Sequence, residues 1–316
     1  MKTNIFLLSA IVFTITTFPS AKAQKADNLK GEIAISGAFA LYPMVVKWAD
    51  EFKKLHPKVR IDVSAGGAGK GITDVLSKVV DIGMVSRDIY PEETKKGAFP
   101  IAVTKDAVVP VISESNPALQ DLVLKGLKQN VAKDIWITGK VTAWNVGFKV
   151  KNSSPIHVYT RSDAAGAAEI WAEYLGKKQE DLLGVGVFGD PGLATAVKND
   201  PLGIGFNNIG YVYDQKTKKP NHGIRVLPID LNNNGKIDAD ENFYNTQDEI
   251  INAISIGKYP SPPARDLFFV TSGKPLKNEL REFIKWVLTE GQKYVNESGY
   301  IKLSDEKIND ELKKLK

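Results

Sequence analysis

The stretch Ser64-Ala65-Gly66-Gly67-Ala68-Gly69-Lys70-Gly71-Ile72 lies between a strand-like run and a helix-like run. Four glycines and a lysine at such a junction are typical of phosphate-binding loops, because unpaired N–H groups at a helix start attract anions. The P-loop of nucleotide hydrolases needs Ser or Thr after its Gly-Lys pair, where this chain has Gly71. The spacing of the glycines also does not match the dinucleotide-binding motif. The stretch therefore predicts either another kind of anion-binding turn or a tight turn without a ligand.

Alternating strand-like and helix-like runs surround this stretch. The hydrophobic pattern predicts strands over 31–36, 59–64 and 81–85, with helices over 41–55 and 71–79. The same order returns later, as a strand over 156–159, a helix over 166–175 and a strand over 203–206. This βαβ rhythm predicts an α/β protein whose parallel strands are covered by helices.

Three further turns follow predicted strands in the same way. They are 37–43 (Gly-Ala-Phe-Ala-Leu-Tyr-Pro), 86–88 (Ser-Arg-Asp) and 160–167 (Thr-Arg-Ser-Asp-Ala-Ala-Gly-Ala). Open α/β sheets bind ligands at the carboxyl ends of their strands. Arg87 and Arg161 add guanidinium groups, whose planar fork suits an oxyanion. Four such turns in one chain favour a shared oxyanion site.

The amino-terminal segment has the pattern of a cleaved signal peptide. Lys2 precedes an apolar run over 5–17, and Ala21-Lys22-Ala23 matches an A-x-A cleavage site, which predicts a signal peptide over 1–23. The apolar run is shorter than the roughly 20 residues that a membrane span needs. The chain has no cysteine, so no lipoprotein-type anchor is expected. We expect a periplasmic protein, released in soluble form.

Charge argues against a nucleic-acid partner. The formal net charge is +5, and removing 1–23 deletes two lysines and no acid, so the mature chain carries 5 − 2 = +3. The basic residues are scattered along the chain and form no strongly basic face. Without disulfides, an exported chain depends on core burial or on a metal for its stability.

Eight blocks together resemble the phosphate-binding proteins of bacterial phosphate ABC transporters, over essentially the whole mature chain. The resemblance implies a two-domain periplasmic-binding-protein fold of type II, with one oxyanion bound in the cleft between the domains. It also implies a monomer that delivers its ligand to a membrane permease and catalyses no reaction. The blocks are 31–52, 64–72, 79–89, 99–112, 135–145, 159–175, 201–213 and 283–303.

The chain departs from this family where hydroxyl groups are expected. The family holds its ligand with backbone N–H groups, Ser and Thr hydroxyls, an arginine and an acid, which here would be Asp88 or Asp163. Residues without a hydroxyl stand at 38, 40, 41, 67, 68, 165 and 167. Each lost hydrogen bond to a charged ligand removes about 1.5–3 kcal/mol. The resemblance assigns the ligand to Leu41, Tyr42, Gly67, Ala68, Gly69, Ser86, Arg87, Asp88, Arg161, Ala165, Gly166 and Ala167.

A second motif, at 230–241, matches the twelve-residue calcium loop. Oxygen-bearing residues occupy its first, third, fifth, ninth and twelfth places, with glycine at the sixth, where the chain turns sharply. Hard oxygen ligands at this spacing predict a structural Ca²⁺ site, which would stabilise a chain without disulfides. A polar turn without a metal is the alternative. The predicted ligands are Asp230, Asn232, Asn234, Lys236 (through its carbonyl), Asp238 and Glu241.

The sequence offers few candidate catalytic residues. The three histidines, at 56, 157 and 222, are spaced for neither a zinc site nor a catalytic triad. We therefore expect no enzyme. Two interpretations of the binding site remain open: a phosphate-type oxyanion receptor, or the same fold with a different small ligand or a calcium-stabilised interaction or sensing role.

The domain boundaries follow from the resemblance. We expect domain I to comprise 24–107 plus 268–316, and domain II to comprise 108–267, including the calcium-type loop. The chain would cross between them near 108–111 and 265–270. Closure of the two domains would bury the ligand and present a surface to the permease.

Overall fold

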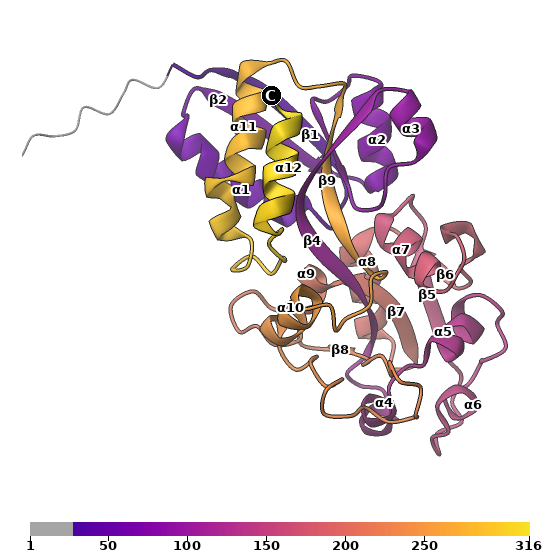
Figure 1. Ribbon diagram of the computed structural model, residues 1–316. Helices are drawn as coiled ribbons and strands as arrows, with labels where there is room; N and C mark the ends of the chain where they lie inside the picture. Colours follow the sequence, from indigo (N-terminus) through magenta and orange to yellow (C-terminus); the bar gives the residue numbers. More distant parts are fainter. Residues whose placement is uncertain (1–27) are drawn as a thin grey trace, which may run out of the picture.

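The computed structural model describes residues 28–316, so the predicted signal peptide lies outside the described residues. Two lobes are joined by two long strands, β4 and β9, which run from one lobe into the other (Figure 1). The strands are β1 (Gly31–Gly37), β2 (Val59–Ala65), β3 (Ile82–Val85), β4 (Ala98–Ser113), β5 (His157–Arg161), β6 (Val185–Val187), β7 (Gly203–Asn208), β8 (Ile224–Val226) and β9 (Ala264–Ser272).

Helices cover both lobes. Domain I carries α1 (Tyr42–Leu55), α2 (Ala68–Leu76), α3 (Pro91–Lys95), α11 (Asn278–Leu288), η2 (Glu290–Tyr294) and α12 (Asp305–Lys314). Domain II carries α4 (Leu119–Lys125), α5 (Gln129–Trp136), α6 (Trp144–Phe148), α7 (Gly166–Tyr174), η1 (Gln179–Asp181), α8 (Gly189–Asn199), α9 (Ile209–Val212) and α10 (Gln247–Ser255).

The sheet order, β2-β1-β3-β9-β4-β7-β5-β6 with β8 beside β4, places the join between the lobes on β4. Along 98–107 β4 pairs with β9, and along 108–112 it pairs with β7. The strand therefore changes partners between Ala107 and Val108. The parallel pairs predicted from the βαβ rhythm are present, as β1 with β2 and β3, and as β5 with β7.

The described residues form three hydrophobic clusters, one in domain I and two in domain II. In domain I, α1 and α11 bury Trp48, Phe52 and Phe283 against the sheet. In domain II, Trp136 and Trp171 pack edge to face at 5.3 Å beside Phe206 of β7. Lobes with separate hydrophobic clusters, joined by two strands, have the arrangement that lets them move relative to each other.

The opening stretch contains less loop than its sequence predicts. Helix α2 begins at Ala68, three residues before the expected start at Gly71, so only Gly66 and Gly67 form the turn. Gly71 lies against β1 and β3: a methyl group on it would be 2.6 Å from the Met84 carbonyl oxygen and 2.9 Å from Gly37 Cα. This glycine lets the helix backbone touch the sheet, so it has a packing role. Lys70 is half exposed and pairs with Asp74.

Strand β8 precedes the calcium-type motif, and helix α10 follows it. The strand ends at Val226, and the helix begins at Gln247. Thr246 caps that helix, because its side chain accepts a hydrogen bond from the Glu249 amide.

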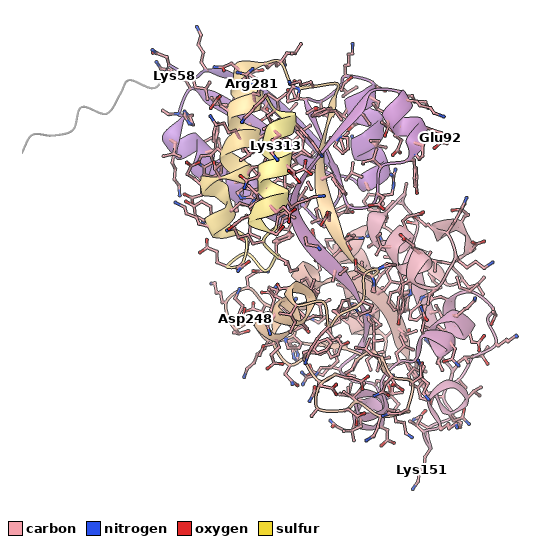
Figure 2. The ribbon with its side chains drawn as sticks, in the orientation of Figure 1. Lys58, Glu92, Lys151, Asp248, Arg281 and Lys313 are labelled. Carbon is pink, nitrogen blue, oxygen red and sulfur yellow. The ribbon has the colours of Figure 1, made fainter. Side chains whose placement is uncertain are left out.

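No helix within 28–316 has the length and apolar character of a membrane span. Figure 2 shows the labelled charged side chains of Lys58, Glu92, Lys151 and Asp248 at the periphery of both lobes. These charges of both signs, on different parts of the surface, agree with the scattered pattern in the sequence.

Candidate anion-binding site

Helices α2 of domain I and α7 of domain II begin at the boundary between the lobes. The Gly69 amide donates to the Ala164 carbonyl at 3.0 Å, which joins the two lobes directly. A methyl group on Gly67 would lie 2.8 Å from Asp163 Oδ2, and one on Gly166 would collide with Ser86. The two helix starts and the end of β3 are thus in close contact.

Several backbone donors at these helix starts have no protein acceptor. Among the described residues, the amides of Ala68, Gly166 and Ala167 donate no hydrogen bond. They belong to the first turns of nine-residue helices, where the helix dipole favours negative charge. Three of the predicted ligand residues therefore offer free amides at one place.

Arg161, at the end of β5, is the buried cation of this site. Its Nε and Nη2 donate to the two carboxylate oxygens of Asp163 at 2.9 and 2.6 Å, and Nη1 donates to Asp190 Oδ2 at 2.7 Å. Burial disfavours the guanidinium charge, but Asp190 and Asp163 outweigh this effect and raise the pKa of Arg161. Three of the five N–H groups of an arginine are used, which leaves two for a ligand.

A buried polar network continues from Asp190 to the strands that join the lobes. Asn208 donates through Nδ2 to Asp190 Oδ1 at 2.5 Å and accepts a hydrogen bond from Arg265 of β9. Arg265 also donates to the Gly166 carbonyl at 2.6 Å and lies 3.7 Å from Asp106 of β4. The sequence pattern did not indicate these residues as part of the site. The only available signal was polar residues at strand ends, namely Asp190 after β6 and Asn208 at the end of β7.

Other predicted ligand residues are placed differently. Arg87 forms a two-bond ion pair with Glu93 at 2.7 and 2.9 Å and lies over the Tyr90 ring, so its fork is used within domain I. Asp88 is exposed to solvent.

Three backbone amides of the predicted ligand residues already have acceptors. The Leu41 and Tyr42 amides donate to carbonyls of their own turn, and the Ala165 amide donates to Gln179. The carboxylate at the helix starts is that of Asp163.

Two hydroxyls and one aromatic ring complete the site. Ser86 is buried against Gly166, and Thr160, before Arg161, has a buried hydroxyl without a hydrogen-bond partner among the described residues. Phe39 of domain I lies 5.6 Å from the Arg161 guanidinium and packs edge to face with Phe188 of domain II. A groove of about 500 Å³ opens beside these residues and is lined from both lobes, by Gly69, Arg87, Tyr90, Thr160, Arg161 and Asp163.

The calcium-type loop is closed by hydrogen bonds to its own backbone. Asp230 accepts from the Asn234 and Gly235 amides, and Glu241 accepts from the amides of Leu231, Asn232 and Asp238. The side chains of Asn232 and Asn234 both reach Asp238 Oδ2, at 3.0 and 2.7 Å. Within 28–316, no three histidine, cysteine or acidic side chains gather in a way that could hold a metal.

The sequence matches one family model, that of a PBP superfamily domain, over residues 20–290. Among curated relatives, the phosphate-binding protein PstS of Methanocaldococcus jannaschii is 26% identical, over 90% of this chain and 86% of its own. The PstS of Bacillus subtilis is also 26% identical, over 91% of this chain and 88% of its own.

Solved structures agree on the fold. The phosphate ABC transporter substrate-binding protein of Clostridium perfringens, with bound phosphate, is 25% identical with a TM-score of 0.70 and covers 87% of this chain and 100% of its own. An ABC-type phosphate transport receptor from Vibrio cholerae matches with a TM-score of 0.62 at 20% identity, over 85% of this chain and 99% of its own. The predicted two-lobed α/β binding-protein fold is therefore confirmed.

Proposed function

This chain belongs to the PBP superfamily, and from that premise we propose that it captures phosphate for an ABC transporter. The observation that carries the proposal is the meeting of two helix starts from opposite lobes beside a buried arginine. Free amides of Ala68, Gly166 and Ala167 face the boundary where Arg161 keeps two unused N–H groups. Helix starts and a guanidinium fork are the groups that proteins use to hold oxyanions.

Relatives support phosphate as the ligand. The curated relatives are phosphate-binding proteins by name, and the Clostridium perfringens protein was solved with phosphate bound. The hydroxyls that the sequence lacks at 165 and 167 have two substitutes nearby, Ser86 and the unpartnered Thr160. A binding role without catalysis fits this set of donors.

Isothermal titration of phosphate into residues 24–316, prepared free of ligand, tests the proposal. One-to-one binding to the wild type, lost in Ala167→Pro, is expected, because proline removes the amide donor and is tolerated in the first turn of a helix. The matched control is Glu92→Pro, which places the same residue in the first turn of α3, at an exposed position. Wild-type protein that shows no heat at millimolar phosphate would refute the proposed ligand.

Export and delivery complete the proposed role. The signal-peptide pattern over 1–23 supports secretion with cleavage near Gln24, and the absence of cysteine gives no site for a lipid anchor. The partner would be the membrane permease of an ABC transporter, which a two-lobed receptor contacts when its cleft is closed. A monomer is sufficient for this role, because each chain carries both lobes of the site.

We also propose that the loop 230–241 binds Ca²⁺ as a structural ion. The buried carboxylates of Asp230 and Glu241 lie at the first and twelfth places, and the third, fifth and ninth side chains converge on one another. Ile237, at the eighth place, donates its amide to the Leu124 carbonyl at 2.8 Å, so α4 supports the loop. Binding would require Asp238 and Glu241 to exchange their hydrogen bonds for the ion.

A further inference from the structure

The buried network at the lobe boundary contains more acids than bases. Its carboxylates are Asp106, Asp163 and Asp190, and its guanidinium groups are Arg161 and Arg265; all five side chains are at most 8% exposed. Three negative and two positive charges give a net charge of 2 − 3 = −1 when every group is ionised. An anion bound at Arg161 adds further negative charge at a place that water screens poorly.

Asp106 is the carboxylate of this network that is least compensated. Neither of its oxygens has a hydrogen-bond partner among the described residues, and its nearest cation, Arg265 Nη2, is 3.7 Å away. The two residues face each other in register on β4 and β9, the strands that join the lobes. The other charged or titratable groups that act on Asp106 are Asp190 of α8, Tyr211 of α9, Tyr259 and Tyr300.

A short chain of contacts links Asp106 to the anion site. Arg265 holds the Gly166 carbonyl at the start of α7 and, through Asn208, reaches Asp190 and Arg161. We propose that Asp106 is a positioning residue of the anion site and takes up a proton when the anion binds, so that affinity depends on its protonation. This inference rests on the proposed phosphate binding.

The ionisation of Asp106 supports the inference. Burial raises its pKa to about 7, against the opposing effects of Arg265 and of the Ala107 backbone amide. A carboxyl group in this range is partly ionised at neutral pH, so an incoming negative charge shifts it toward the protonated form. Protonation also frees Arg265 from a close counter-ion and leaves its charge available to the network.

Titration calorimetry of phosphate in buffers of different ionisation enthalpy tests the inference. When phosphate binds at pH 8, the wild type should take up more protons than Asp106→Asn, because the amide of the variant resembles the protonated acid. Between pH 7 and pH 8, the affinity of the wild type for phosphate should fall about fivefold more than the affinity of the variant. The reason is that the protonated fraction of Asp106 falls by that factor. The titration of phosphate itself is common to both proteins and cancels in the comparison.

The matched control is Asp266→Asn. Asp266 pairs with Lys105 on the neighbouring rung of the same two strands, on the exposed side, and should behave as the wild type does. Equal proton uptake by wild type and Asp106→Asn would contradict the inference while leaving phosphate binding intact. Absence of phosphate binding by the wild type at any pH would instead refute the proposed function and the inference together. If Asp106→Asn does not fold, the wild type alone is measured. Proton uptake beyond that of phosphate itself supports the inference, and uptake equal to that of phosphate itself refutes it.

Discussion

Arg161 combines a structural role with its proposed role in binding the anion. Its charge is compensated by Asp163 and Asp190, and all three side chains are almost fully buried. Such an arrangement fixes the direction of the guanidinium before any ligand arrives, which reduces the ordering cost of binding. The same burial makes the arginine costly to remove, because its partners would become unpaired charges.

We therefore expect Arg161→Ala to lower the free energy of unfolding by about 3–5 kcal/mol, in addition to abolishing phosphate binding. Urea denaturation followed by circular dichroism measures the first effect. Arg60→Ala is the control, because Arg60 forms exposed ion pairs with Glu32 and Asp62 that contribute little to stability. A variant as stable as the wild type would show that the network is not a stabilising unit.

At the scale of elements, glycine determines how closely α2 approaches the sheet. Gly71 faces Gly37 across the interface between α2 and β1, and Gly83 of β3 lies against the same helix turn. This approach directs the start of α2 toward α7 of the other lobe. The glycines of the opening stretch thus act on the site through packing, and the free amide there belongs to Ala68.

Gly71→Ala should destabilise the protein by about 1–3 kcal/mol, because its methyl group would overlap the Met84 carbonyl and the helix must shift. Gly210→Ala in α9 is the control, since its nearest neighbour would be the Tyr300 hydroxyl at 3.9 Å. Alanine favours a helix over glycine by about 1 kcal/mol, so the control should be neutral or stabilising. Equal stability of both variants would exclude a packing role for Gly71.

The calcium-type loop makes a separate prediction at the same scale. Calcium at 100 times its Kd should stabilise the wild type by about 2.7 kcal/mol, seen as a higher Tm than in chelator. Glu241→Gln should lose this difference, because it removes the charge of the twelfth ligand. Asp240→Asn, an exposed acid of the same loop outside the ligand places, should keep it. A wild-type Tm that calcium leaves unchanged would identify the loop as a polar turn.

At the scale of the whole molecule, acids buried between the lobes link stability to pH. Burial raises the pKa of Asp106 to about 7 and raises that of Asp190 as well. The folded protein therefore holds protons that the unfolded chain releases near the ordinary value of 3.8. The stability contributed by the Asp106 proton is complete below that value and is lost as the pH rises through about 7.

The free energy of unfolding of the wild type, measured without phosphate, should fall relative to Asp106→Asn between pH 5 and pH 7. The slope of the difference should approach at most about 1.4 kcal/mol per pH unit, the limit for one proton. Asp266→Asn should follow the wild type. Parallel curves for wild type and Asp106→Asn would place the pKa of Asp106 in its ordinary range.

Hydrophobic periodicity and small-residue turns are local signals, so the sequence alone predicted the βαβ alternation and suggested an anion site at the strand ends. It named Arg161 and the amides of Ala68 and Gly166 as candidate ligands of that site. It did not predict that α2 begins at Ala68, three residues before Gly71, because the close packing of Gly71 on the sheet depends on residues distant in sequence. Only the folded structure shows that Arg87 pairs with Glu93 and that Asp106, Asp190 and Arg265 meet at the lobe boundary. Burial and long-range pairing fix which charges compensate one another, and neither is written in a local pattern.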